Sequence, residues 1–477
     1  MCGGYMTSET FSNFGGNQWF QPNVVYRPRD EAELLEIMGR SRGRAIRVVG
    51  RLHSWSEAAV GNDVVIDLRG LCDVSLEQHE GRVWVTASCG CQIKTLQAVL
   101  GPAGLTVPSL GLINEQSIAG AISTGTHGSG RPSMSNFIDE VRVAVYDASG
   151  VPVIRTIGGG DELRAARCSL GAMGVIVSVG FWARAAYRVE EHFRQYENLD
   201  RVLAKEEEYP LQQFFLMPWW WKYIAQHRRE TAEPRSWWAS LYRLYVFLQL
   251  DVGLHLLVWF VARLLRSATV ARFAYKYVTP CMVIKNWRVV DDADQQLVME
   301  HELFQHIECE MFVVRSRLRE SLEIVVQLLK HFDGEREALA DSTRDALRRL
   351  NLMEDVEANC GMYTHHYPIC VRRVLPDDTL ISMAAGNAEA CYAISFISYE
   401  RRGDRAAFMA FSRVVCRLLG DLFGARPHWG KVCPLTADEV ERLYPAVQTF
   451  RDTCGEIDRA GVFRNEWIER VVFGKSS

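Results

Sequence analysis

The sequence has no block of positive charge. Its 54 lysine and arginine residues are outnumbered by 58 aspartate and glutamate residues, for a formal net charge of −4 at pH 7. A protein that binds nucleic acid neutralises phosphates with clustered lysine and arginine. The composition therefore predicts no nucleic-acid partner, and its 48% of hydrophobic residues suffices for a substantial core.

The sequence also lacks a disulfide framework and a secretory signal. Its 13 cysteines are scattered through 477 residues without regular spacing, which is typical of reduced intracellular thiols. Residues 1–18 are polar and rich in glycine, serine and asparagine, without a basic start or an apolar stretch. We therefore expect an intracellular protein without a signal peptide.

No internal repeat is present, and no Gly-x-Gly-x-x-Gly motif follows a predicted strand. Short helices and strands alternate instead. They are a helix at 30–40 with Asp30 as N-cap, strands at 45–49, 63–68 and 82–87, a helix at 91–100, a hairpin of 141–147 with 151–157, a helix at 161–168 and a strand at 175–179. Without the glycine motif, this alternation argues against a Rossmann domain.

Two stretches suit the binding of a cofactor. Residues 48–55, Val-Val-Gly-Arg-Leu-His-Ser-Trp, leave a strand, turn at Gly50 and present His53 beside Ser54. Residues 114–130, Asn-Glu-Gln-Ser-Ile-Ala-Gly-Ala-Ile-Ser-Thr-Gly-Thr-His-Gly-Ser-Gly, consist mainly of small residues and hydroxyls. A glycine permits close approach of the backbone to a ligand. A run of small residues can wrap its backbone N–H groups around a pyrophosphate.

These two stretches resemble the FAD-binding domain of the vanillyl-alcohol oxidase superfamily. A third stretch, Arg426-Pro427-His428-Trp429-Gly430-Lys431, resembles the hallmark of its sugar-1,4-lactone oxidase and alditol oxidase branch. The resemblance runs from about residue 23 to 473. It implies an α+β fold with a two-part, PCMH-type FAD-binding domain at 1–185 and 426–477. An α/β cap domain with an antiparallel sheet, at 186–425, would bind the substrate.

The resemblance also implies the cofactor and its contacts. The histidine of Gly-x-x-His-Ser is joined covalently to the flavin in the family, so we expect FAD bound covalently at His53. His127 is expected to be a buried histidine that shapes the backbone rather than a second attachment point. The predicted cofactor contacts are Gly50, Arg51, Leu52, His53, Ser54, Ser109, Ser117, Gly120, Ser123, Thr124, Thr126, His127, Gly128, Gly174, Val175, Ile176, His428 and Lys431.

The expected catalytic residues are Arg372, Lys431, Ser117 and Cys370. Hydride transfer to flavin requires the substrate hydroxyl to lose a proton and cationic groups to stabilise the developing negative charge. Members of the family use a Glu-x-Arg pair on a cap-domain strand together with the lysine of His-Trp-Gly-Lys. Here Arg372 and Lys431 match, but Cys370 occupies the glutamate position. A thiol with the usual pKa of about 8.5 is mostly neutral at pH 7, which puts the substrate or the full activity in doubt.

The resemblance implies oxidation of the CH–OH group of a sugar-1,4-lactone of the gulono, galactono or arabinono type, with an ascorbate-like product. Electrons would pass to O2 or another acceptor. An alditol oxidase is the nearest alternative, and a flavin-binding protein with weakened turnover is a third reading, which Cys370 favours. The sequence does not distinguish an oxidase from a dehydrogenase.

A long apolar segment, within residues 236–270, interrupts the cap domain. Residues 244–265 approach the length of a membrane span but include Asp251, His255 and Arg263. Those three polar residues and Arg266 fall within roughly a 120° arc of a helix, and a buried aspartate in a span costs on the order of 3 kcal/mol. Residues 244–266 are therefore expected to lie on a membrane surface, with a core helix or a true span as alternatives.

The rest of the cap domain reads as strands at 307–314, 362–374 and 389–399, with helices at 319–332 and 406–419. We predict no metal site. His301 and His306 are five residues apart, roughly 140° around a helix, so they cannot face one metal. Neighbouring His365 and His366 would point to opposite faces of a strand.

Overall fold

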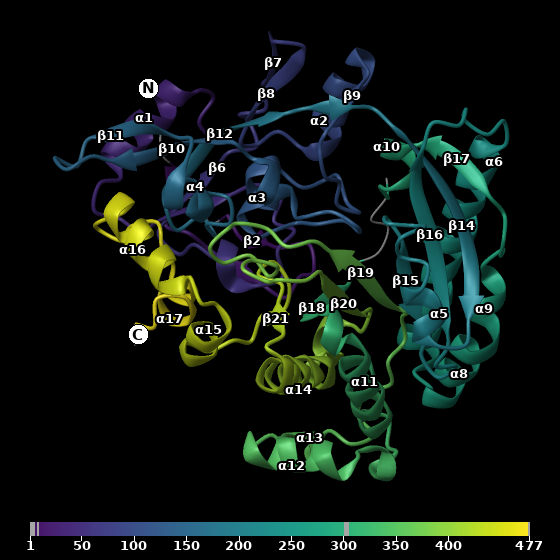
Figure 1. The fold of residues 1–477 in the computed structure, drawn as a ribbon. Helices are drawn as coiled ribbons and strands as arrows, with labels where there is room; N and C mark the ends of the chain where they lie inside the picture. Colours follow the sequence, from purple (N-terminus) through teal and green to yellow (C-terminus); the bar gives the residue numbers. More distant parts are fainter. Residues whose placement is uncertain (1–4, 7–8, 300–304, 476–477) are drawn as a thin grey trace.

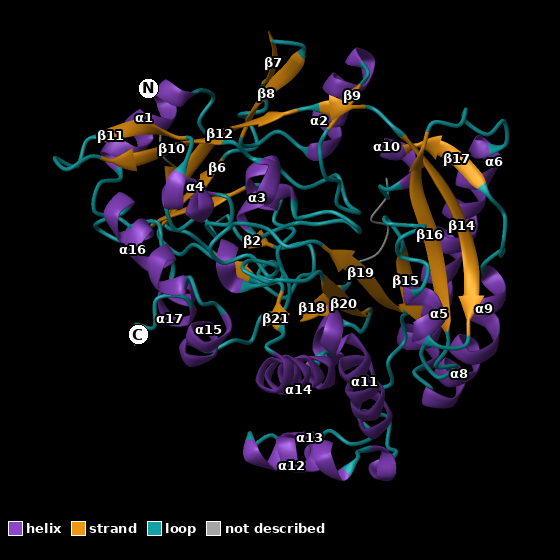
Figure 2. Cartoon of the chain, viewed as in Figure 1, coloured by secondary structure: helices purple, strands orange, loops and turns teal. Residues whose placement is uncertain are grey.

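The computed structural model describes residues 5–6, 9–299 and 305–475 (Figure 1). The N-terminal strands and helices gather on one side of the molecule, and a large antiparallel sheet with its own helices forms the other side (Figure 2). The C-terminal helices return to the N-terminal side. This two-part α+β arrangement agrees with the predicted fold class.

A four-stranded sheet of order β1-β4-β6-β5 begins the N-terminal part. Its strands are β1 (Tyr5–Met6), β4 (Val24–Tyr26), β5 (Ile46–Val49) and β6 (Val64–Asp67), and the last three run parallel. Helix α1 (Glu31–Arg40) connects β4 to β5, and the side chain of Asp30 accepts a hydrogen bond from the backbone of Glu33. The predicted N-cap is therefore confirmed.

A five-stranded antiparallel sheet of order β11-β10-β12-β8-β7 packs next to it. Its strands are β7 (Val74–His79), β8 (Arg82–Ser88), β10 (Glu140–Tyr146), β11 (Pro152–Ile157) and β12 (Val175–Trp182). The helices on this side are α2 (Ile93–Leu100), α3 (Ile118–Ser123) and α4 (Gly160–Ala166). The predicted hairpin is confirmed, because β10 pairs antiparallel with β11.

The eight-stranded antiparallel sheet has the order β17-β14-β16-β15-β19-β20-β18-β21. Its strands are β14 (Arg188–Tyr196), β15 (Gln213–Leu216), β16 (Tyr223–Thr231), β17 (Val289–Asp292), β18 (Ile307–Val314), β19 (Ile369–Val374), β20 (Cys391–Ser398) and β21 (Arg426–Pro427). Helices α11 (Leu318–Phe332) and α14 (Ala406–Phe423) cover one face. That face shares a core with Ile307, Val371 and Phe396.

One strand is shorter than its sequence predicts. The expected strand at 362–374 begins only at Ile369, because Pro368 cannot donate a ladder hydrogen bond and the residues before it form a loop. The paired strand β20 and the two long helices lie where the sequence places them, with α14 extending to Phe423.

A pair of antiparallel helical segments, residues 239–282, packs against the β14–β16 half of the sheet; we call it the helix pair. Its first segment comprises α6 (Ala239–Tyr245), α7 (Leu254–Trp259) and π-helical turns at 246–253 and 260–265. Its second comprises α8 (Ala268–Phe273), a π-helical turn at 274–278 and α9 (Thr279–Met282). The first segment is long and apolar enough to cross a membrane, yet only 22% of its most apolar window is buried in the protein.

The C-terminal helices α15 (Ala437–Leu443), α16 (Val447–Ile457) and α17 (Glu466–Val471) pack into the core that holds the N-terminal strands. Trp429 and Trp467 lie in this core together with Ile66 and Val143. The chain thus returns to the N-terminal part after β21, as the sequence leads us to expect. The exact division at residues 185 and 425 stays a prediction.

Candidate active site

A cavity of about 740 Å³ lies between the N-terminal part and the large sheet. We name its three sides by their residues. The loop wall is formed by residues 47–59, 112–127 and 170–176, the sheet floor by the uncovered face of the eight-stranded sheet, and the helix wall by the inner face of the helix pair. Its volume lies within the range of about 300–1,000 Å³ usual for small-molecule sites.

The loop wall brings together the three sequence stretches singled out above. Strand β5 ends at Val49, and a Cβ added to Gly50 would lie 2.3 Å from Ser117 Oγ, so the first two stretches touch. Leu52 takes the left-handed backbone conformation, with φ of 55°. The Trp55 N–H donates to the Gly430 carbonyl at 2.8 Å, which joins the first stretch to the third. The ring of His53 stacks on that of Phe14, with centroids 5.5 Å apart.

Most of the predicted site residues line this cavity. They are Gly50, Arg51, Leu52, His53, Ser54, Ser117, Gly120, Ser123, Thr124, Thr126, His127, Gly174, Ile176, Cys370, Arg372, His428 and Lys431.

Three predicted cofactor contacts lie behind the wall instead. Val175 points away because its neighbours Gly174 and Ile176 on the same extended segment face the cavity. The Ser109 hydroxyl donates to the Pro132 carbonyl at 3.0 Å. Gly128 is packed so tightly that a Cβ there would lie 2.2 Å from the Leu110 carbonyl oxygen.

The sheet floor presents two carboxylates that the sequence analysis missed. In β18, Ile307, Cys309 and Met311 point into the helix-covered core, so Glu308 and Glu310 face the cavity. Both are buried, with Glu310 only 2% exposed. The signal available in the sequence was acidic residues at every second position of an otherwise apolar strand.

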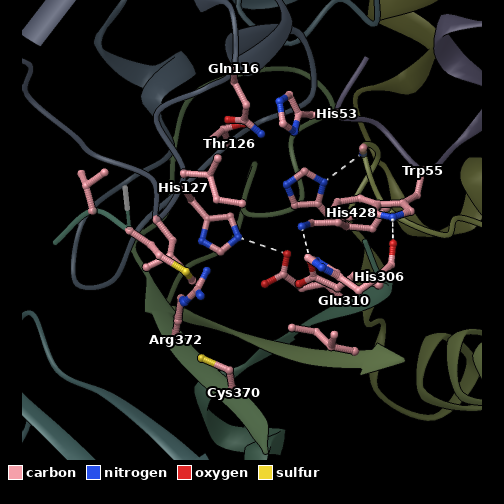
Figure 3. Close-up of a pocket in the computed structure, with 18 of the residues that line it drawn as sticks. His53, Trp55, Gln116, Thr126, His127, His306, Glu310, Cys370, Arg372 and His428 are labelled. Atoms are coloured by element: carbon pink, nitrogen blue, oxygen red, sulfur yellow. Dashed lines mark hydrogen bonds and ion pairs between the residues drawn. The ribbon is translucent and has the colours of Figure 1, made fainter. Parts of the chain in front are cut away.

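Cys370 and Arg372 lie side by side on the floor, two residues apart on β19 (Figure 3). Arg372 Nε donates to Gln213 Oε1 at 3.1 Å, and the guanidinium makes no ion pair with any described residue. Burial raises the pKa of the Cys370 thiol, so the thiol stays neutral near pH 7. Burial alone would lower the pKa of Arg372, but Cys370, Glu310 and Glu308 outweigh it and raise that pKa.

Lys431 reaches the cavity from the loop after β21. Its ammonium forms an ion pair with the Glu308 carboxylate and lies 4.4 Å from the centre of the Trp55 ring. The lysine side chain is only 17% exposed, so this is a desolvated ion pair within the cavity. The two expected cations, Arg372 and Lys431, therefore both face the same space as His53.

His127 and His428 are buried between the loop wall and the sheet floor (Figure 3). His127 Nε2 lies 3.4 Å from Glu310 Oε2, and its Nδ1 lies 3.0 Å from the Gly128 carbonyl oxygen. His428 Nδ1 accepts a hydrogen bond from the Gly430 N–H at 2.9 Å. Burial lowers the pKa of His428 to about 3, so this imidazole is neutral at physiological pH. His127, Glu310 and His428 offer ligand atoms that all lie within 4.8 Å of one another, so these described residues have the spacing of a candidate metal site where the sequence predicted none. His301 lies outside the described residues.

The helix wall is largely apolar. Its apolar cavity-facing residues come from both segments of the helix pair and are Leu244, Val246, Phe247, Leu250, Leu254, Met282 and Val283. Polar side chains interrupt this surface, namely those of Tyr242, Arg243, Asp251, His255 and Thr279. Apolar residues of the sheet floor continue this surface, among them Phe215, Met217, Ile224 and Ile397. Farther along the same strands, β15 and β16, the side chains of Gln213, Gln226 and Arg228 make the floor polar. The cavity therefore has a polar end beside Arg372 and Lys431 and an apolar extension along the helix pair.

The loop wall fits an FAD molecule. Glycines stand where a side chain would fill the space or collide: a Cβ at Gly174, whose φ is 138°, would lie 2.7 Å from the Ala144 carbonyl oxygen. Hydroxyls of Ser117, Ser123 and Thr124 line the same surface. Small residues allow the backbone to approach phosphates closely. These residues would hold the dinucleotide, and FAD would supply the two-electron oxidant.

Comparisons with known proteins agree with this geometry. A family model described as FAD binding domain matches residues 22–179, and the model described as D-arabinono-1,4-lactone oxidase matches residues 179–471. A long-chain alcohol oxidase of an uncultured marine euryarchaeote is 49% identical over 461 residues, covering 96% of each chain. An L-gulono-1,4-lactone dehydrogenase of Mycobacterium tuberculosis is 28% identical, covering 98% of this chain and 99% of the other. A solved structure of a solvent-stable cholesterol oxidase has the same fold, with a TM-score of 0.72 at 15% identity and 97% coverage of both chains.

Fold and site together define an FAD-binding oxidoreductase with the PCMH-type fold. More narrowly, the chain belongs to the D-arabinono-1,4-lactone oxidase family. The resemblance drawn from the three sequence stretches is thus confirmed at the level of family and fold. The names of its relatives differ in substrate, so the family alone does not fix what this chain oxidises.

Proposed function

We propose that the protein uses FAD to oxidise the CH–OH group of a long-chain alcohol whose hydrocarbon chain lies along the helix wall. The observation that carries this is the apolar extension of the cavity, lined by Leu250, Leu254 and Met282. Burying a methylene stabilises a complex by about 0.8 kcal/mol. A sugar hydroxyl on the same surface would lose its hydrogen bonds to water, at a cost of about 1–3 kcal/mol. The name of the 49% identical relative supports the same substrate class.

A sugar-1,4-lactone, the substrate class expected from the sequence, is the second candidate. The family model favours it, and so do the polar side chains of Gln213, Gln226 and Arg228 on the sheet floor. A lactone carries several hydroxyls that such groups could bind. It would leave the helix wall unused, and this is why we place it second.

The chemistry of the site follows from its charges. FAD supplies the two-electron oxidant when bound. Arg372 and Lys431 both line the cavity and would bind the substrate oxygen, where negative charge develops as its proton is lost. The Ser117 hydroxyl, next to Gly50, would contact the cofactor or substrate. Buried, neutral Cys370 supplies no charge. O2 or another acceptor would then take the electrons.

We further propose that FAD is joined covalently to His53. His53 lines the cavity on the loop that the FAD binding domain model covers. Acid precipitation of the purified protein should leave the yellow colour in the pellet. Peptide mass mapping should then find the FAD mass on the peptide that contains His53, and the His53→Ala variant should release its flavin. Flavin in the supernatant of the wild type would show that His53 is only a neighbour.

The substrate class is tested by anaerobic mixing of the holoprotein with candidate donors. We expect 1-dodecanol to bleach the flavin absorbance far more efficiently than 1-butanol, L-gulono-1,4-lactone or xylitol. If only the lactone bleaches the flavin, the second candidate is favoured. If only xylitol bleaches it, the protein is an alditol oxidase. A holoprotein that no donor bleaches would instead be a flavin-binding protein with weakened turnover.

The outer face of the helix pair suits a lipid surface. Leu241, Leu248, Leu256 and Leu264 are each more than half exposed. Residues 235–288 contain eight lysines and arginines against one aspartate, a net of +7 in a chain whose total is −4. Five of these eight cations form ion pairs with acidic residues outside this range, as Arg266 does with Asp404. Lys276 and Lys285 form no ion pair within the described part of the chain. Anionic lipid attracts such segments.

We therefore propose that the helix pair lies on an anionic membrane surface, where long-chain alcohols would partition. Vesicles of phosphatidylcholine with 30% phosphatidylserine should sediment the protein, and pure phosphatidylcholine should do so much less. The Leu248→Gln/Leu256→Gln variant, which leaves the cavity face intact, should stay in the supernatant. Equal sedimentation of this variant and the wild type would contradict the proposal.

A further inference from the structure

The register of the strands divides the sheet floor into rows of side chains. Residues opposite one another in antiparallel strands point to the same face of the sheet. One row is polar and consists of residues paired across β16, β15 and β19, namely Gln226, Gln213 and Arg372. The next row, two residues further along each strand, consists of Ile224, Phe215 and Cys370. All of these residues line the cavity, so a polar row and a largely apolar row lie side by side on its floor.

The second row changes character at Cys370. Beyond this residue the row continues into Ser395 on β20 and Glu310 on β18. On the other side of Cys370 lie the aromatic ring of Phe215 and the aliphatic side chain of Ile224. Phe215 and Cys370 face each other in register, and we call them the Phe215–Cys370 pair. The pair therefore lies where the apolar extension of the cavity meets its polar end.

The amide groups of the polar row are committed to one another. A guanidinium can only donate, so Arg372 Nε, which lies 3.1 Å from Gln213 Oε1, fixes which end of that amide faces it. Gln213 Nε2 then donates to Gln226 Oε1 at 2.6 Å. The Gln213 side chain, next to the pair, is thus already hydrogen-bonded at both ends.

The other polar side chain in register with the pair is also engaged. The Ser395 hydroxyl donates to Glu310 Oε1 at 2.6 Å. Cys370 itself offers a thiol, a weak hydrogen-bonding group whose sulfur lies 4.0 Å from Gln213 Oε1. A buried thiol behaves as a small hydrophobic group. A ligand hydroxyl placed against the Phe215–Cys370 pair would therefore exchange its hydrogen bonds to water for contacts with sulfur and a phenyl ring.

We propose that the Phe215–Cys370 pair determines specificity by contacting the carbon atoms next to the reacting CH–OH group and by discriminating against a second hydroxyl there. This role rests on the proposed function and narrows its substrate class to alcohols whose neighbouring carbons are methylenes. In that chemistry Arg372 and Lys431 bind the reacting oxygen, and both line the cavity with the pair. A second hydroxyl on the next carbon would be buried without a full hydrogen bond, which weakens binding.

Two substrates that differ only in this hydroxyl provide the first test. Flavin reduction of the wild-type holoprotein is compared for 1-dodecanol and 1,2-dodecanediol in the same detergent. We expect kcat/KM for the diol to be about 10–100-fold lower, as for a hydrophobic site that meets an added hydroxyl. Equal values for the two alcohols would overturn the proposal.

The Cys370→Ser variant tests the thiol, because it replaces a weak hydrogen-bonding group by a hydroxyl of similar size. We expect the ratio of kcat/KM for the diol to that for 1-dodecanol to rise roughly 3–10-fold above the wild-type ratio, on the scale of one added hydrogen bond. In Cys370→Ala, which adds no polar group, the ratio should stay within about twofold of wild type. Each ratio is taken on one protein, so losses of folded protein or of flavin cancel. Equal ratios in Cys370→Ser and Cys370→Ala would contradict the proposal.

Two further variants test the other member of the pair and provide a control. Phe215→Gln puts an amide beside Cys370 and should also raise the ratio, by roughly 3–10-fold. Cys391→Ser is the matched control, since Cys391 is a buried cysteine on β20 that packs in the core holding the N-terminal strands. Its ratio should equal that of wild type. A wild-type ratio in Phe215→Gln, or a shift in Cys391→Ser as large as that in Cys370→Ser, would count against the pair.

The same measurements separate this proposal from the proposed function. If wild type oxidises 1-dodecanol but Cys370→Ser leaves the ratio unchanged, the proposed function stands and the role of the pair is wrong. If wild type oxidises L-gulono-1,4-lactone and no long-chain alcohol, the proposed function fails. The role of the pair then fails with it, because the pair accepts a polyhydroxylated substrate.

Discussion

The two long walls of the cavity are built from opposite kinds of residue. The loop wall is rich in glycines, hydroxyls and loop backbone, whereas most of the helix wall consists of leucine, valine and methionine side chains on helices, with Asp251, His255 and Thr279 among them. A loop wall of this kind binds a constant ligand through close backbone contact. An apolar wall binds its ligand in proportion to the apolar surface that is buried, without a fixed direction, so it tolerates substitutions. Under the proposed function, the loop wall would determine cofactor binding and the helix wall substrate choice.

The largest expected effect comes from adding a single methyl group to a glycine that supports the loop wall. Gly128→Ala places a Cβ 2.2 Å from the Leu110 carbonyl oxygen, so the backbone behind the wall must move. We expect a loss of at least 2 kcal/mol in the free energy of unfolding, at the level of about 1–3 kcal/mol known for overpacking, together with loss of bound flavin. Gly159→Ala is the matched control, because no atom lies within 4 Å of its Cβ position. The flavin content and the free energy of unfolding in denaturant are measured for the two variants and for wild type.

The polar end joins the two walls, and its ion pair should matter for rate more than for folding. Lys431→Met removes a cation and leaves the carboxylate of Glu308 buried without its partner. We expect the rate of flavin reduction to fall by about 10²-fold, on the order of removing one stabilising group. The Glu308→Gln/Lys431→Met variant should regain thermal stability without regaining rate. If the double variant regains both thermal stability and rate, the ion pair has only a structural role.

The helix wall should tolerate substitution and change only substrate preference. Leu250→Asn puts an amide against the hydrocarbon chain, and we expect kcat/KM for 1-dodecanol to fall roughly 10–100-fold, since burying a leucine side chain contributes about 1.5–3 kcal/mol. The value for 1-butanol and the flavin content should change less than threefold. Leu248→Asn, on the exposed face, is the control with detergent-dispersed substrate. Equal losses for both alcohols would contradict a chain-binding wall.

The last prediction concerns the pH dependence of stability near the Arg266–Asp404 ion pair, which joins the helix pair to the rest of the protein. Arg266 pairs with Asp404, and Glu400 lies nearby with a pKa raised to about 7, chiefly by burial. A carboxyl whose folded pKa exceeds its unfolded pKa of about 4.5 destabilises the fold once ionised, so stability should fall as pH rises from about 4.5 to 7. Glu400→Gln should therefore be more stable than wild type at pH 8, by on the order of 2 kcal/mol, and equal to it at pH 4.5. Unfolding in urea at the two pH values measures this.

Local signals in the sequence were sufficient for much of the fold. Asp30 caps α1 as predicted because an N-cap depends on the neighbouring residues alone. The β10–β11 hairpin also forms as predicted, since its turn lies at Ala148-Ser149-Gly150 between two apolar runs. Strand pairing across the large sheet depends on contacts distant in sequence, and no local pattern predicted the neighbours β14, β16 and β15.

The candidate site divides in the same way. His53, Ser117, Arg372 and Lys431 could be named from short motifs, and the structure brings them to one cavity. Glu308 and Glu310 were missed, because a strand pattern tells which residues alternate but not which face meets a cofactor. The apolar run at 244–265 suggested a membrane, and its inner face turned out to line the cavity. That second role depends on the tertiary packing of the helix pair.

The central claim is that the helix wall binds the hydrocarbon chain of the substrate. A 12-carbon primary alcohol with a diazirine at its far end tests this most directly, by photolysis with the holoprotein and mapping of the labelled peptides. The account predicts label on residues of the cavity face, such as Leu250, Leu254 and Met282, and its suppression by excess 1-dodecanol. Label confined to exposed Leu241, Leu248 and Leu256, or unaffected by 1-dodecanol, would contradict it.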